Sequence, residues 1–108
     1  MAKLAYPKRK QFRKTYIREW RLDRGLTLEV LADRIGIKAS ALSYLERGQS
    51  AYTQGTLEAL AAALQTDPAS LIMRNPNDVD AIWSIWDDAS EAEKRQISDV
   101  VKALKRAS

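Results

Sequence analysis

The stretch from Leu26 to Gly48 limits the possible folds of this chain most tightly, because it holds two apolar patterns of helical spacing separated by a glycine. The apolar residues on either side of Gly36 recur at intervals of three and four, at Leu28, Leu31, Ala32, Ile35, Leu42 and Leu45. This spacing puts the residues of each pattern on one face of a helix, and the glycine interrupts the run. We therefore expect two short helices joined by a tight turn.

Positive charge is concentrated in front of this stretch. Residues 1–24 contain nine Lys and Arg against two Asp and Glu, which gives +7, whereas the rest of the chain has nine basic and twelve acidic residues, which gives −3. A basic front end favours contact with a polyanion from one side, with a solvated charged tail as the alternative. Two helices at a fixed angle are also how proteins lay a helix into the major groove of DNA. Double-stranded DNA is therefore the partner that we expect.

The composition excludes several classes of site. The 108 residues suffice for one small domain with short attachments. Because the chain has no cysteine and no histidine, disulfides, thiolate nucleophiles, Cys/His zinc sites and histidine-dependent catalysis are ruled out. Carboxylates alone could still bind a hard metal, but we expect no cofactor and no enzymatic activity. No segment resembles a membrane span or a secretory signal, so we expect no membrane partner and a cytoplasmic, nucleoid-associated protein.

We expect an all-α fold in three parts: a basic N-terminal arm over residues 1–14, a five-helix domain over residues 15–74 and a C-terminal helical hairpin over residues 75–108. Arg74 to Asp78 have the composition of a linker, so we place the boundary near Asn75. In the first helix, which should end before Gly25, we expect Ile17, Trp20 and Leu22 to face the core.

Residues that begin helices are recognisable by their side chains. Thr27 and Thr53 carry hydroxyls that can accept a backbone N–H from the first turn of the second and fourth helices. Asp67 followed by Pro68 indicates the start of a short fifth helix. The third helix should span about residues 39–47 and end before Gly48.

The last thirty residues carry apolar faces that a two-helix hairpin cannot bury by itself. One face is formed by Val79, Ile82, Trp83 and Trp86. Ser90 and Glu93 match a capping box at the start of the next helix. Such a hairpin must pack on the first domain or on another chain. We assign its apolar residues to dimerisation, with packing within one chain as the alternative: Trp83, Trp86, Ile97, Val100, Val101 and Leu104.

The segment from Gly25 to Gly48 resembles the corresponding part of a known protein family. Gly25-Leu26-Thr27, Leu31-Ala32, Ile35-Gly36-Ile37 and the closing segment LSYLERG at 42–48 follow the register of the phage Cro/CI repressor-like regulators, also called the XRE family. The likeness covers about residues 17–71. It implies a five-helix, lambda-repressor-like helix-turn-helix domain and a sequence-specific DNA-binding transcriptional regulator. For its action we expect a repressor, rather than an activator, that binds a pseudo-palindromic operator as a homodimer.

The resemblance also implies roles for residues by position. The helix laid in the groove, together with its flanks and the start of the preceding helix, would contact DNA through Thr27, Lys38, Ala39, Ser40, Ser43, Tyr44, Arg47 and Gln49. Arg21 and Glu46 would form an ion pair that ties the first helix to the end of the third and makes no contact with DNA.

The third helix predicts sparse reading of base edges. Bidentate hydrogen bonds from Arg or Lys to guanine, and from Asn or Gln to adenine, each discriminate against a wrong base by ~1–3 kcal/mol. Of these types only Lys38 is expected to face the groove, because Arg47 at the end of the helix is expected near the phosphates. We therefore expect the affinity to depend on the arm, which would follow phosphates or enter a narrow minor groove. The arm residues that we assign to DNA are Lys8, Arg9, Lys10 and Arg13.

Two other functions deserve comparison with DNA-dependent regulation. The first is an antitoxin of a toxin–antitoxin pair, which would regulate its own gene through the DNA-binding domain and bind a toxin, as a protein partner, through the C-terminal hairpin. The second is binding to a membrane surface through the arm. This function is disfavoured because the segment PKRKQFRK contains only Phe12 as a large apolar anchor.

Overall fold

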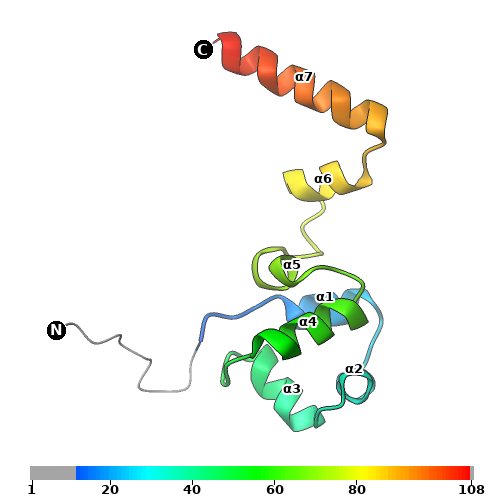
Figure 1. Cartoon of the computed structure of the whole chain (residues 1–108), viewed down its shortest axis with the longest axis vertical. Helices are drawn as coiled ribbons and strands as arrows, with labels where there is room; N and C mark the ends of the chain where they lie inside the picture. The colour runs from blue at the N-terminus through cyan, green and yellow to red at the C-terminus, as the bar shows by residue number, and fades with distance from the viewer. Residues whose placement is uncertain (1–11, 108) are drawn as a thin grey trace, which may run out of the picture. The chain divides into compact units, whose positions relative to one another are not determined.

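The computed structural model describes residues 12–107, which form helices and no strands. The helices are α1 (Ile17–Asp23), α2 (Leu28–Ile35), α3 (Ala39–Glu46), α4 (Gln54–Ala63), α5 (Pro68–Met73), α6 (Ile82–Asp88) and α7 (Glu91–Ala107). The predicted all-α class, with five helices followed by a helical pair, is confirmed (Figure 1). The chain divides into two compact units, of which the first ends at Asn77 and the second begins at Asp78.

Each of the first five helices, or the residue that ends it, contributes to one hydrophobic core. The large side chains that are fully buried are Ile17, Leu31, Leu42, Leu60, Leu64 and Leu71. Within the unit, α2 packs on both α3 and α4, and α5 packs on α4 and α1. Burying one such side chain contributes about 1.5–3 kcal/mol. The core therefore fixes the angle between α2 and α3.

One expectation for the first helix is wrong. Ile17, Trp20 and Arg21 are buried in α1, whereas the side chain of Leu22 is 50% exposed. Residues at i, i+3 and i+4 share a helix face, and a residue two positions after Trp20 points the opposite way. Arg21 therefore takes the inward position that we expected for the leucine.

The predicted helix caps are confirmed. The hydroxyl of Thr27 accepts the N–H of Val30 at 3.2 Å, and that of Thr53 accepts the N–H of Thr56 at 3.1 Å. The carboxylate of Asp67 accepts the N–H of Ser70 at 2.8 Å, which lowers the pKa of Asp67. Each cap satisfies a backbone donor that the first turn of a helix leaves unpaired.

Gly36 makes the turn between α2 and α3. Its φ of 73° lies in the left-handed region, where a side chain would be strained. Its N–H donates to the carbonyl of Asp33 at 3.2 Å, and the N–H of Ile37 donates to that of Ala32 at 3.0 Å. These two bonds end α2 and let the chain enter α3 after only two further residues.

The end of α4 has the same backbone conformation without a glycine. Gln65 has a φ of 56°, and its N–H donates to the carbonyl of Ala62 at 3.2 Å. Replacing Gln65 with glycine should raise the free energy of unfolding by about 0.5–1 kcal/mol, because the left-handed strain is removed at some cost in chain entropy. Urea unfolding followed by circular dichroism would measure this change. A lower stability of Gln65→Gly would contradict the expectation.

The second unit consists of α6, α7 and the segment before them. The helix predicted to include Val79 begins only at Ile82, so Val79 precedes it. The capping box at the start of α7 is confirmed, since the N–H of Ser90 donates to the carboxylate of Glu93 at 3.0 Å and lowers its pKa. Neither α6 nor α7 contains a buried residue. Among residues 12–107, no helix is long and apolar enough to cross a membrane.

Candidate DNA-binding surface

The exposed side of α3 is small and neutral at its beginning. Lys38 is the exposed N-cap residue of α3, and its side chain makes no cap hydrogen bond. Ala39 is half-buried and Ser40 is exposed in the first turn. This end of the helix can therefore approach a base edge closely, with Lys38 at its margin as a cationic donor.

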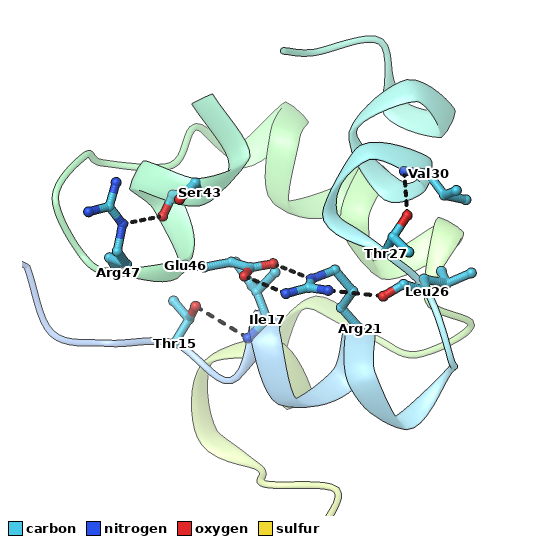
Figure 2. Close-up of polar contacts among 9 residues, drawn as sticks. All are labelled: Thr15, Ile17, Arg21, Leu26, Thr27, Val30, Ser43, Glu46 and Arg47. Atoms are coloured by element: carbon cyan, nitrogen blue, oxygen red, sulfur yellow. Dashed lines mark hydrogen bonds and ion pairs between the residues drawn. The ribbon is translucent and has the colours of Figure 1, made fainter. Parts of the chain in front are cut away.

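The second half of α3 carries larger polar groups. Tyr44 has 49% of its surface exposed, and Ser43 beside it is half-buried. The Nε of Arg47 donates to the carbonyl oxygen of Ser43 at 3.3 Å, and its guanidinium lies 5.1 Å from the centre of the Tyr44 ring. Figure 2 shows Arg47 turned back toward Ser43. The guanidinium and the phenol thus form one exposed, cationic and aromatic cluster, which suits a sugar-phosphate backbone.

Two further expected contacts flank α3. Thr27 is exposed at the start of α2, with its hydroxyl engaged by Val30 (Figure 2). Gln49 is exposed just after α3, and its N–H donates to the carbonyl of Tyr44 at 2.9 Å. The backbone N–H of Gln49 thus helps to end α3, and its side chain is exposed where it can contact a ligand.

Arg21 and Glu46 lie behind α3 and hold it in place. The Nε and Nη2 of Arg21 donate to the two carboxylate oxygens of Glu46 at 2.7 and 3.1 Å. The Nη1 of Arg21 donates to the carbonyl of Leu26 at 2.9 Å, so one guanidinium joins α1, the loop before α2 and the end of α3 (Figure 2). The side chains of Arg21 and Glu46 are only 10% and 4% exposed, which makes this a structural pair.

The start of the described chain runs beside the end of α3. The N–H of Phe12 donates to the carbonyl of Gly48 at 2.6 Å, and the N–H of Tyr16 donates to that of Leu71 at 2.7 Å. Arg13, between these two anchors, is exposed. The other expected arm residues, Lys8, Arg9 and Lys10, lie outside the described residues.

Trp20, which was expected in the core, and Arg24 make contacts within the first unit that the sequence does not predict. The indole N–H of Trp20 lies 3.2 Å from the carbonyl of Ser70 and 2.8 Å from that of Arg74. The Nε of Arg24 donates to the carbonyl of Leu64 at 2.8 Å, and its guanidinium lies 5.1 Å from the Trp20 ring. Arg24 belongs to the basic front end of the sequence, but these contacts give it a structural role.

The family assignment follows from the segment that contains these elements. The sequence profile of the helix-turn-helix family HTH_3 matches residues 17–71, from the start of α1 to the buried Leu71 of α5. The chain belongs to this family. As an HTH_3 protein it is a DNA-binding transcriptional regulator, as the resemblance to the XRE regulators implied.

Comparison of folds extends beyond the HTH_3 domain. A chain of the solved SinR protein/SinI protein complex is similar, with 25% sequence identity and a TM-score of 0.54. The match covers 83% of this chain and 94% of the solved chain. No curated protein sequence matches.

Proposed function

We propose that this HTH_3 protein is a homodimeric repressor that occupies a pseudo-palindromic operator with one α3 in each half-site. The exposed face of α3, held rigidly by the buried Arg21–Glu46 pair, carries this proposal. Bound over a promoter, such a dimer would exclude the transcription machinery.

The division of labour on the DNA follows from the side chains. Ala39 can contact a thymine methyl, Ser40 and Ser43 can each make a single hydrogen bond, and Lys38 can reach a guanine. The Tyr44–Arg47 cluster suits phosphate and sugar. Because single hydrogen bonds discriminate weakly, α3 sets the register and phosphate contacts supply much of the affinity.

The arm is the main source of those phosphate contacts in our proposal. Replacing Lys8, Arg9 and Lys10 together with glutamine removes three positive charges from the full chain. If each contacts one phosphate, the slope of log affinity against log salt should fall in magnitude by about 2.7. Fluorescence anisotropy of a labelled operator at several salt concentrations would measure the slope.

A matched control removes the same charge elsewhere. Arg95, Lys102 and Arg106 lie exposed on α7, and their replacement with glutamine changes the net charge equally. This control should keep the wild-type slope, because general long-range attraction is screened within about 10 Å at 0.1 M salt. Equal slopes for the two triple variants would refute a specific role for the arm.

The second unit supports the dimer. Its residues with large exposed apolar side chains include Ile82, Ile85, Trp86, Val100, Val101 and Leu104. Trp83 and Ile97, also assigned to dimerisation, are half-buried. On α7, Ile97, Val100, Val101 and Leu104 form one stripe at i, i+3, i+4 and i+7. A stripe of this kind is stable in water when another surface covers it. We propose a second copy as that surface, because two-fold dimers bind half-sites about 34 Å apart.

A different protein is the second candidate for the same surface. The similar solved chain comes from a complex of two named proteins, SinR and SinI. A heterologous partner on α6 and α7, including a toxin as in the antitoxin alternative, would leave this chain monomeric in isolation. Sedimentation of the purified chain distinguishes the two candidates.

A further inference from the structure

The backbone of the arm meets the backbone that ends α3 at Gly48. The N–H of Phe12 donates to the carbonyl of Gly48 at 2.6 Å. A Cβ added to Gly48 would lie 2.6 Å from the carbonyl oxygen of Phe12 and 3.6 Å from its carbonyl carbon. Because those atoms belong to the backbone, a rotation of a side chain could not relieve the clash. Either the arm or the backbone at Gly48 would have to shift.

Gly48 also ends α3. Its φ is 72°, its N–H donates to the carbonyl of Leu45 at 3.1 Å, and it is buried. The residue therefore has two tasks that both require the absence of a side chain. Its N–H helps to end α3, and its carbonyl oxygen accepts the N–H of Phe12 from the arm.

The contact also borders a cavity. Phe12, Arg13 and Thr15 from the arm side and Leu45, Gly48, Ser50, Ala51 and Tyr52 from the α3 side line a cavity of about 210 Å³. All the residues that line it lie within four positions of Phe12 or Gly48 in the sequence. The arm is thus seated against the last turn of α3 and the loop that follows.

We infer that Gly48 is a positioning residue for DNA binding, which docks the basic arm at the end of α3 where the Tyr44–Arg47 cluster meets the phosphate backbone. The inference rests on the proposed contact of the arm with phosphates. Four residues span at most about 14 Å, so Lys8, Arg9 and Lys10 are tethered within that reach of Phe12. Docking at Gly48 keeps their charges close to the phosphates beside α3 and raises their effective concentration there.

Comparison of two glycine-to-alanine variants separates the loss of arm docking from the backbone strain of a left-handed residue. The test variant is Gly48→Ala. The matched control is Gly25→Ala, because Gly25 has a φ of 69° but no atom within 4 Å of an added Cβ. Both variants strain the backbone, whereas only Gly48→Ala displaces the arm. Each would be made in the full chain with and without the arm neutralisation at Lys8, Arg9 and Lys10. Affinity for a double-stranded DNA site, selected from random sequences by binding to the wild type, would then be measured at about 50 and about 200 mM salt.

The expected results concern the fold loss of affinity between the two salt concentrations. Neutralising the arm in the wild type should make this loss about 40 times smaller. Three fewer phosphate contacts reduce the slope of log affinity against log salt by about 2.7, and the salt concentration changes about fourfold. Gly48→Ala should make it at least about 10 times smaller, and Gly25→Ala less than about twofold smaller. In the Gly48→Ala background, neutralisation should have at most about a fourfold further effect.

Two different failures are distinguishable. If neutralising the arm of the wild type changes the salt dependence less than about twofold, the phosphate contacts of the arm and its docking are both wrong. If neutralisation has its full effect in the wild type and in Gly48→Ala alike, the arm binds DNA but Gly48 does not position it. Unfolding curves check that the variants are folded.

A second pair of variants serves if Gly48→Ala does not fold. Phe12→Pro removes the N–H that bonds to Gly48 and changes no residue of α1 to α5. Its control, Phe12→Ala, keeps the N–H and loses only the ring. The proline variant should reproduce the loss expected of Gly48→Ala, and the alanine variant should keep more of the wild-type salt dependence. The reverse order would overturn the docking of the arm through its backbone.

Discussion

Replacing Glu46 with leucine is expected to lower the free energy of unfolding by about 3–5 kcal/mol, because the charge of Arg21 is then left buried without its partner. The side chains of this pair are 10% and 4% exposed, and two hydrogen bonds join them. Arg21→Met should cost about as much. Urea unfolding followed by circular dichroism gives both values.

The double variant Arg21→Met with Glu46→Leu tests the cause of that loss. Without either charge, the interior has no unpaired ion, so the double variant should be more stable than each single one. The exposed pair Asp23–Arg24 provides a control on the same helix, with side chains 36% and 33% exposed. Asp23→Asn should cost no more than about 1 kcal/mol. Additive losses in the double variant would show that the two charges are not coupled.

Replacing Val101 and Leu104 with glutamine is expected to convert the protein from a dimer to a monomer and to weaken operator binding at least about 100-fold. The two residues are 48% and 66% exposed on the apolar stripe of α7. Covering such a stripe provides the association energy of the proposed dimer. A dimer that binds two half-sites at once has an affinity about 10²–10⁴ times higher than a single unit on one half-site. A monomer loses this gain.

The control for this variant alters the opposite face of α7. Asp99→Gln with Arg106→Gln replaces two exposed residues and keeps the net charge. It should leave both the sedimentation coefficient and the operator affinity unchanged. A wild-type chain that sediments as a monomer would exclude the dimer and favour a different protein on this surface. A dimer that survives the Val101 and Leu104 replacements would place the interface elsewhere.

The core and the helix starts could be predicted from the sequence because both depend on local regularities. A period of 3.6 residues selects Leu31 and Leu42, and the hydroxyl of Thr53 can reach only the turn that follows it. The same regularity explains the error at Leu22, whose phase on α1 points outward. Composition favoured the leucine, but geometry placed Arg21 inside.

The contacts that join distant parts of the chain could not be predicted in this way. Phe12 and Gly48 meet through backbone atoms, which no side-chain pattern marks. The indole of Trp20 bonds to the carbonyl of Arg74, 54 positions away. The expected DNA contacts rest on the position of each residue in the family register. Tyr44 and Arg47 are both exposed in the structure. Their packing into one cluster could not be predicted from the sequence.

Selection of bound sequences from random double-stranded DNA tests the proposed reading of an operator by α3 most directly. The wild type should enrich a motif of two inverted half-sites with centres about 10–11 base pairs apart. Tyr44→Ala should alter the preferred half-site. Met73→Ala, which changes a residue that is 76% exposed on α5, should return the wild-type motif. Enrichment of no motif, or of the same motif from Tyr44→Ala, would contradict sequence-specific reading by this helix.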